Sequence, residues 1–256
     1  MTLTGTQAAR PFIMVAPNGG RKTKLDHPAL PITPAELAHC ARECRAVGAD
    51  TLHLHIRDAA GGHTLDAGLY REVLNEIETQ APGFDVQITT EALGRYSAQD
   101  QRQLVRELGH KRVSIALREQ QPDHDPRAAR DFYHWAAEAG IEIQHILYSP
   151  GERAWLERLQ AAGTLPDAPQ RVLYVLGRYQ TGVSSDPVSI RAFLGAGTRP
   201  VRWMVCAFGQ AETACLTEAH RLGGEMRVGF ENNLLNADGE VAQDNADRVR
   251  DLLLRL

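Results

Sequence analysis

The sequence predicts a (β/α)8 barrel, and three observations lead to this prediction. Eight apolar runs rich in β-branched residues recur along the 256 residues, amphipathic segments separate them, and the runs start roughly 25 to 40 residues apart. Regular alternation of strand and helix indicates a parallel sheet with crossover helices. Eight such units in this length match the barrel. We expect a single domain over residues 1–256, because no linker or low-complexity segment divides the chain.

The apolar runs give the expected strands, which are residues 12–16, 51–56, 85–89, 112–117, 142–148, 171–176, 201–208 and 226–230. Thr33, followed by Pro34 and Glu36, has the capping-box pattern of a helix start. Similar starts are expected at Ser97, Asp125 and Ser185. Glycines that suit left-handed C-caps are Gly48, Gly140, Gly163 and Gly223.

The composition, 43% hydrophobic and 23% charged residues, is ordinary for a soluble globular protein. A formal net charge of -4 gives no basic surface for nucleic acid, and no apolar run is long enough to cross a membrane. The four cysteines form no CxxC pair, which favours a reduced, cytoplasmic setting. No glycine-rich dinucleotide or P-loop motif follows any expected strand, so those two classes are disfavoured.

Two histidines, His53 and His55, lie two residues apart in the second expected strand. Side chains at i and i+2 of a strand point to the same face, so both imidazoles enter one space while Leu52 and Leu54 point the other way. The usual reason for two converging imidazoles is a metal ion. A hydrogen-bonded pair in the core is the alternative.

Polar residues at the other strand ends are expected to join these histidines, because such barrels carry their chemistry at the C-terminal ends of the strands. The eighth strand pairs with the first in a closed barrel, so Glu231 can reach His53 and His55. Two imidazoles and one carboxylate match a catalytic zinc site with an open position, and they equally match a non-haem iron site. The other interpretation of Glu231 is a surface or helix-capping carboxylate. Asn18 and Glu91 belong to the same set of strand ends.

Four more residues are candidates for holding a ligand. Arg227 would need a carboxylate partner, from the protein or the substrate, if it entered the barrel. The alternative is a surface charge on the far side of its strand. Arg21, on a glycine-rich loop, can pair with an anionic substrate group or stay solvated. Thr89 and Ser114 can donate hydrogen bonds to a bound oxygen, but strand hydroxyls are common without a ligand.

Four segments of the chain resemble the β-keto acid cleavage enzymes, in the same order and over nearly its whole length. They are residues 16–21, 27–34, 53–58 (His-Leu-His-Ile-Arg-Asp) and 227–233 (Arg-Val-Gly-Phe-Glu-Asn-Asn). The resemblance implies a zinc-dependent TIM barrel with one zinc ion per chain. It also implies that a β-keto acid reacts with acetyl-CoA to give acetoacetate and a new CoA thioester, in a homo-oligomer (dimer or tetramer).

The resemblance also implies roles for individual residues. The metal ligands would be His53, His55 and Glu231. Arg227 matches the family's active-site arginine, and Thr89 and Ser114 stand where the family holds the substrate's carboxylate or carbonyl; Asn18 is a further candidate substrate contact. Zinc on the ketone would act as a Lewis acid as the C–C bond breaks.

The sequence departs from the family after the metal-ligand glutamate, where the family has a catalytic aspartate and this chain has Asn232. An amide cannot take a proton at neutral pH. Glu91 or another carboxylate can replace the aspartate, the reaction can differ, or catalysis can be weak. Other metal-dependent hydrolases or lyases and a weakly active metal-binding relative therefore stay open. Arg21 replaces an acidic group of the amino-substrate member, which favours a neutral or acidic substrate.

Overall fold

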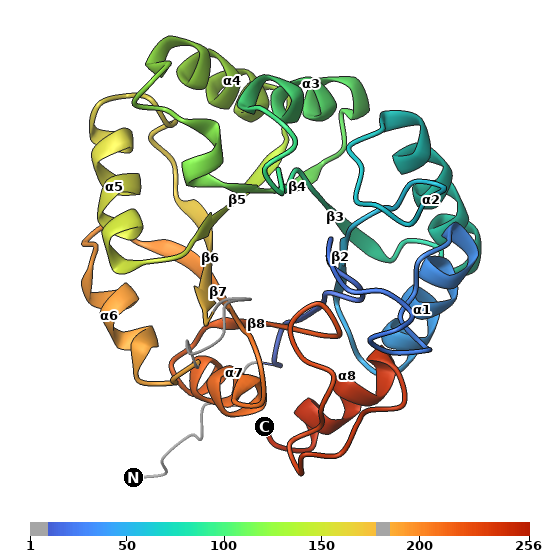
Figure 1. Ribbon diagram of the computed structural model, residues 1–256. Helices are drawn as coiled ribbons and strands as arrows, with labels where there is room; N and C mark the ends of the chain where they lie inside the picture. Colours follow the sequence, from blue (N-terminus) through green and yellow to red (C-terminus); the bar gives the residue numbers. More distant parts are fainter. Residues whose placement is uncertain (1–9, 178–184) are drawn as a thin grey trace, which may run out of the picture.

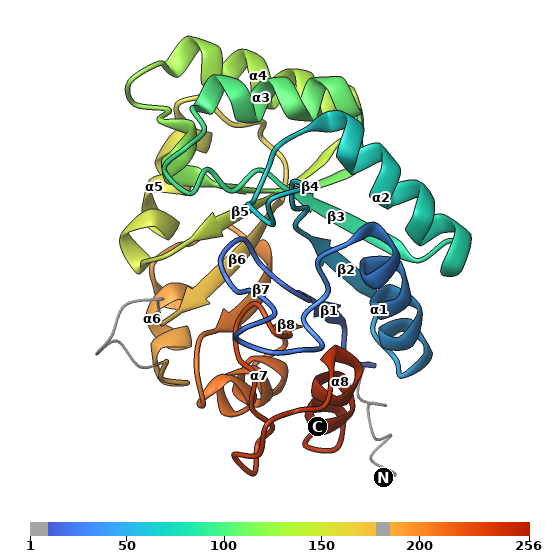
Figure 2. The same ribbon diagram turned by 45° about the vertical axis from the view of Figure 1, so that its right-hand side comes forward.

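The computed structural model describes residues 10–177 and 185–256 as a closed barrel of eight parallel strands (Figure 1). Each strand pairs with its neighbours in sequence, and β1 pairs with β8 to close the ring. Helices surround the strands on all sides (Figures 1 and 2). The predicted (β/α)8 barrel is confirmed.

The strands are β1 Ile13–Val15, β2 Thr51–Leu54, β3 Asp85–Thr89, β4 Arg112–Ala116, β5 Glu142–Leu147, β6 Gln170–Leu176, β7 Val201–Ala207 and β8 Glu225–Val228. The helices are α1 Pro34–Ala46, α2 Ala67–Gln80, α3 Ala98–Leu108, α4 Pro126–Glu138, α5 Pro150–Ala161, α6 Ser189–Gly195, α7 Glu212–Arg221 and α8 Asn245–Leu253. A short 3-10 helix, η1 Leu117–Gln120, follows β4. Most expected strands extend one or two residues too far at their C-terminal ends, where the polar loops of the site begin.

Most expected helix starts are confirmed. Thr33 and Ser97 form capping boxes, and the Asp125 side chain accepts a hydrogen bond from the Ala128 amide. The expected start at Ser185 is wrong, because α6 begins only at Ser189 and has no side-chain cap. The glycines expected as C-caps all have positive φ; they are Gly48, Gly140, Gly163 and Gly223.

Two apolar layers follow from the alternation of side chains along the strands. Leu52 and Leu54 point outward into the large core between the barrel and its helices. A smaller core fills the barrel itself and consists of Met14, Ala116, Ile146, Leu173, Val175, Met204 and Cys206. This inner core lies beside the buried polar groups of the barrel, such as His53, and helps to exclude water from them.

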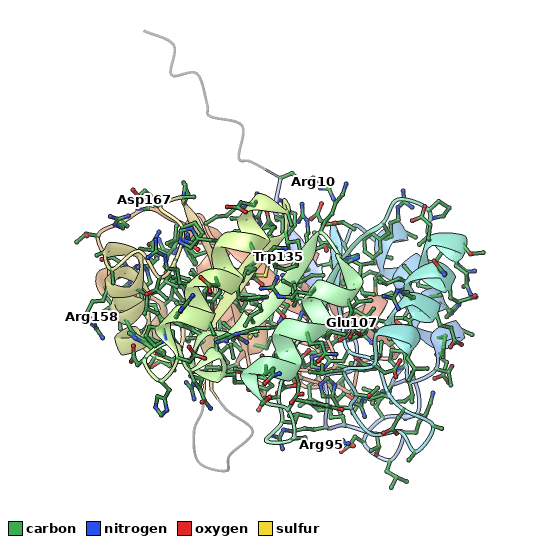
Figure 3. The ribbon with its side chains drawn as sticks, turned by 90° about the horizontal axis from the view of Figure 1, so that it is seen from above. Arg10, Arg95, Glu107, Trp135, Arg158 and Asp167 are labelled. Atoms are coloured by element: carbon green, nitrogen blue, oxygen red, sulfur yellow. The ribbon has the colours of Figure 1, made fainter. Side chains whose placement is uncertain are left out.

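Charged residues at the N-terminal ends of the strands form a chain of ion pairs at the end of the barrel away from the histidines. Arg171 on β6 lies 2.6 Å from Glu142 on β5 and 3.8 Å from Glu225 on β8. Arg112 joins Glu142 and Asp85, and Arg202 joins Glu225. Figure 3 shows the two ends of the barrel, with Arg10 at the N-terminal end and Arg95 at the C-terminal end. This end is built for stability, and the opposite end carries the site.

None of the helices in the described part of the chain combines the length and the apolar character that a membrane crossing requires.

Candidate metal and active site

The closure of the barrel brings the residues of the site together from β2 and β8. β1 lies between these two strands and pairs with both. Glu231 follows β8, and its amide donates to the carbonyl of Ala16 just past β1 at 3.0 Å. Gly229 makes this turn possible, because its φ is +141° and a side chain there would collide with the Ala16 carbonyl oxygen. The backbone therefore directs the Glu231 side chain back over the strand ends.

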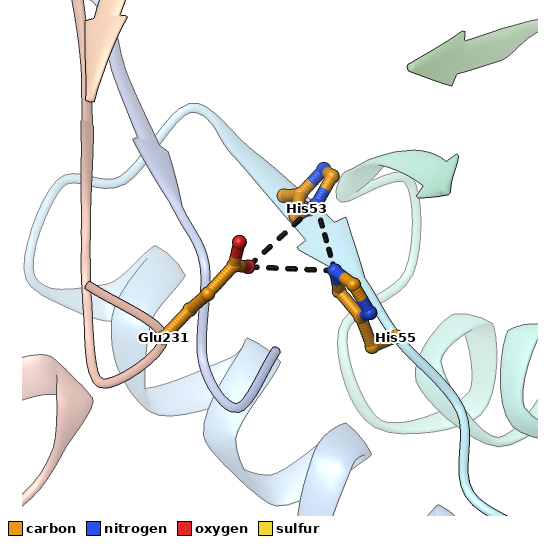
Figure 4. A group of neighbouring side chains, drawn as sticks. All are labelled: His53, His55 and Glu231. Atoms are coloured by element: carbon orange, nitrogen blue, oxygen red, sulfur yellow. Dashed lines mark hydrogen bonds and ion pairs between the residues drawn. The ribbon is translucent and has the colours of Figure 1, made fainter. Parts of the chain in front are cut away.

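His53, His55 and Glu231 converge at the C-terminal end of the barrel (Figure 4). The Nε2 atoms of the two histidines are 3.2 Å apart, and Glu231 Oε2 lies 3.6 Å from that of His53 and 3.5 Å from that of His55. Ligands about 2.0–2.1 Å from a tetrahedral zinc ion would be about 3.3–3.4 Å from one another. The triangle of donor atoms therefore fits three ligands of one small divalent cation.

The protonation states of the three groups also suit a cation. Burial lowers the pKa of His53 to about 4, and burial together with His53 lowers the pKa of His55 well below its usual value. Burial alone would raise the pKa of Glu231, but the charges of Arg227, His53, Lys22 and His63 together outweigh it, and that pKa lies below its usual value. Two neutral imidazoles and an ionised carboxylate are thus present at neutral pH, as metal binding requires.

Arg227 enters the barrel, so its interpretation as a surface charge is wrong. Its side chain is 3% exposed, and its Nη2 donates to Glu231 Oε1 at 3.0 Å and contacts Cys206 Sγ at 3.4 Å. The carboxylate partner that a buried arginine needs is thus Glu231. One carboxylate oxygen faces Arg227, and the other faces the imidazoles.

A cavity of about 490 Å³ opens above the triangle. Its polar lining comprises Arg21, His53, His55, Thr89, Glu91, Arg118, Glu119, Tyr148, Arg227 and Glu231. An apolar wall completes it with Leu93, Ala116, Ile146, Val175 and Phe208. Three arginines balance three glutamates here, so one divalent cation would leave the cavity with a net positive charge. Such a cavity attracts an anionic ligand.

Glu91 lies beside the triangle, with Oε2 3.7 Å from His55 Nδ1. Burial raises the pKa of its carboxyl to about 8, and the carboxylates of Glu231 and Glu119 add to this rise. His63 fixes the backbone at this point, because its Nε2 lies 2.8 Å from the Glu91 carbonyl oxygen and donates to it. A carboxyl group with a pKa near neutrality can both take and release a proton.

Three predicted site residues lie behind the cavity and are absent from its lining. The Asn18 amide donates to the carbonyls of Pro31 and His55, at 3.0 and 3.3 Å, and so ties two loops together. Ser114 lies opposite Thr89 in the β3–β4 register. The Asn232 side chain is 3% exposed. Within the described residues, neither the Ser114 hydroxyl nor the Asn232 amide has a hydrogen-bond partner.

Several residues near the site were missed by the sequence analysis. Gln87 hydrogen-bonds His53 Nδ1 at 2.8 Å, and it could have been found because it shares a strand face with Thr89. His63 stands on the loop after β2, so reading strand ends alone did not reach it. Arg118 and Glu119 lie in η1, which the sequence pattern did not predict. Arg118 stacks 4.0 Å over the Tyr148 ring at the cavity.

Comparison with known sequences agrees with the family resemblance of the four sequence segments. The model of the family described as beta-keto acid cleavage enzyme matches residues 11–253. The 3-keto-5-aminohexanoate cleavage enzyme of Fusobacterium nucleatum is 26% identical over 245 residues, covering 93% of this chain and 88% of that protein. The 3-oxoadipate:acetyl-CoA acetyltransferase of Cupriavidus necator is 24% identical over 249 residues, covering 93% and 85%.

Solved structures share the fold at low sequence identity. ObcA in a binary complex with oxaloacetate superposes with a TM-score of 0.67 at 16% identity, covering 89% of this chain and 63% of that one. The 3-dehydroquinate dehydratase of Geobacillus kaustophilus gives a TM-score of 0.59 at 13% identity, covering 96% and 92%. At these identities the likeness extends to the barrel alone.

Proposed function

Because this chain belongs to the family of β-keto acid cleavage enzymes, we propose that it is zinc-dependent and converts a β-keto acid and acetyl-CoA into acetoacetate and a new acyl-CoA. The observation that carries the proposal is the triangle of His53, His55 and Glu231, with spacings that suit zinc. The printed name of the Cupriavidus necator relative, an acetyl-CoA acetyltransferase for 3-oxoadipate, supports the reaction type.

In this proposal, zinc bound by the three side chains supplies a Lewis acid for the ketone oxygen of the substrate. Glu91 takes a proton from the carbon between the substrate's ketone and carboxylate, because it lines the cavity and its pKa of about 8 makes it a stronger base than an ordinary carboxylate. That carbon then attacks the thioester carbonyl, and CoA leaves as the thiolate. The thiolate attacks the ketone carbon of the substrate, and the bond between this carbon and the carbon that carries the carboxylate breaks. The products are the new acyl-CoA and acetoacetate, which takes back the proton held by Glu91. Arg227 keeps Glu231 ionised and lies close enough to the cavity to neutralise the substrate's carboxylate.

Asn232 does not transfer a proton in this scheme. Its amide has no basic site at neutral pH, and its side chain is absent from the cavity lining. Glu91 takes the part that the family's aspartate would have. Thr89 holds a substrate oxygen from the cavity wall, and Asn18 and Ser114 support the loops and strand behind it.

We further propose that the substrate is an acidic or neutral β-keto acid. Arg21 and Arg118 line the outer part of the cavity, and Arg227 lies deep within it. With a divalent cation bound, a cationic substrate would meet a net positive charge. A second acidic group on the substrate would instead find a guanidinium partner.

The test is a substrate screen on protein whose metal content has been measured. We expect about one zinc ion per chain, loss of that zinc in His53→Ala, and CoA ester formation with at least one acidic β-keto acid. Asn232→Asp, which restores a carboxylate, should retain zinc and tests whether the wild type is limited by that position. If wild-type protein with stoichiometric zinc and Asn232→Asp are both inactive on the whole panel, the chain is a metal-binding relative rather than a cleavage enzyme.

A further inference from the structure

The side of the His53 ring that faces away from Glu231 makes a hydrogen bond inside the barrel. His53 Nδ1 lies 2.8 Å from Oε1 of Gln87, and both residues are at least 95% buried. The register of β2 and β3 places these two residues side by side. Figure 4 shows that the second ring nitrogen of His53 points away from the carboxylate. The contact is therefore built into the sheet and does not depend on a loop.

A second glutamine determines which way the Gln87 amide faces. Gln87 Nε2 donates to Oε1 of Gln144 on β5 at 3.1 Å, and Gln144 Nε2 contacts the sulfur of Met204 on β7 at 3.7 Å. A thioether sulfur only accepts hydrogen bonds, so the NH₂ group of Gln144 faces Met204 and its oxygen faces Gln87. The Gln87 oxygen then faces His53. Each residue of this row therefore donates to the next, from His53 through Gln87 and Gln144 to Met204.

This direction decides the tautomer of His53. An amide oxygen is an acceptor, so Nδ1 must carry the hydrogen and Nε2 keeps its lone pair toward Glu231. With the amide reversed, Nδ1 would hold the lone pair, and an N–H at Nε2 would point at the position where a metal would bind. His55 has no such anchor, because its Nδ1 lies 3.7 Å from Glu91, which is beyond a hydrogen bond.

We propose that Gln87 is a positioning residue that holds His53 in the tautomer and orientation needed for metal binding, with Gln144 fixing the Gln87 amide. The inference rests on the zinc site of the proposed function. Two buried amides inside an otherwise apolar barrel are costly unless they are satisfied, and here they satisfy each other and the histidine. Partners of this kind on the far side of a metal-bound histidine commonly change metal affinity 10–100-fold.

The experiment measures zinc dissociation constants by chelator competition for wild type, Gln87→Leu, Gln87→Met and Gln87→Glu. We expect the affinity to fall about 10–100-fold in the leucine and methionine variants, and to stay within about threefold of wild type in Gln87→Glu, which restores an acceptor. Gln160→Leu is the matched control, because Gln160 is equally buried, lies on α5 and donates to the Ala168 carbonyl. It should bind zinc as wild type does.

Nitrogen-15 NMR of the histidine rings gives a readout that is independent of activity. Wild type and Gln87→Glu should show a protected His53 Nδ1–H, and Gln87→Leu should lose it. Equal zinc affinity and an unchanged Nδ1–H signal in folded Gln87→Leu or Gln87→Met would overturn the inference, and so would an equal loss of zinc in Gln160→Leu. Wild-type protein without stoichiometric zinc would instead overturn the proposed function itself.

Discussion

Zinc binding should release almost no protons from His53 and His55 at pH 6. His53 has a pKa of about 4 and His55 lies well below its usual value, chiefly through burial. Two ordinary imidazoles with pKa values near 6.5 would each be about three-quarters protonated at pH 6, so a metal would displace about 1.5 protons from them. With its pKa of about 4, about 1% of His53 rings are protonated at pH 6, and the lowered pKa of His55 also favours its neutral ring, so the two histidines have almost no protons to release.

The pH dependence of the affinity follows from the same numbers. Between pH 7.5 and pH 5.5, two unshifted histidines would weaken zinc binding about 100-fold, because each gains a proton that the metal must displace. With lowered pKa values the affinity should change less than about twofold. Glu231 stays ionised over this range, since its pKa is lowered as well.

Calorimetric titration of zinc into metal-free Glu91→Gln protein, in several buffers of different ionisation enthalpy, measures the proton count of the histidines. The variant removes the Glu91 carboxyl, which is protonated at pH 6 and would lose its proton beside a cation. Circular dichroism at each pH verifies that the protein stays folded. Release of one or more protons by this variant at pH 6, or a fall in its zinc affinity approaching 100-fold by pH 5.5, would show that burial does not keep these imidazoles neutral.

Three further predictions concern the base, the substrate and the fold. Glu91→Gln should retain zinc and lower kcat at least about 100-fold. In the wild type, kcat/KM should rise as the pH increases toward the Glu91 pKa of about 8, since the base acts only when ionised, and the variant should lack this rise. A variant that keeps the wild-type pH profile would exclude Glu91 as the base. Arg21→Glu should raise the KM for an acidic β-keto acid about tenfold and leave the KM for a neutral one nearly unchanged. Steady-state assays on both substrates measure this difference. An unchanged preference would show that Arg21 does not contact the substrate. Arg171→Met should lower the free energy of unfolding by about 1–2 kcal/mol and Tm by about 2–8 °C in calorimetry, because it leaves Glu142 and Glu225 without their shared cation. The exposed pair of Arg191 with Glu218 provides the control, and an equal effect of Arg191→Met would contradict the special role of the strand-end ion pairs.

The sequence was sufficient to predict that His53, His55 and Glu231 lie together. Alternation along one strand places His53 and His55 on a single face, and closure of an eight-stranded barrel makes β8 a near neighbour of β2. Both arguments depend only on periodicity and topology. For that reason Glu231 could be assigned to the same site from a position far away in the chain.

Loop conformation set the limit of the sequence prediction. Asn18 was predicted as a substrate contact, and the structure shows its amide donating to the carbonyls of Pro31 and His55. An asparagine side chain can satisfy either role, and only the path of the two loops decides between them. Arg118 was overlooked for a similar reason, because η1 is a single short turn without a periodic pattern.

The inner core of the barrel controls the chemistry of the site through desolvation. Burial above the apolar layer removes water from His53, His55 and Glu231, which makes the imidazoles neutral but would also protonate Glu231. Arg227 is the largest of several charges that together oppose this, because it lies 3.0 Å from the carboxylate, and it also disfavours protonation of His53. One buried guanidinium therefore favours opposite charge states on neighbouring side chains. That arrangement gives a physical reason for Arg227, rather than an apolar residue, at this position of β8.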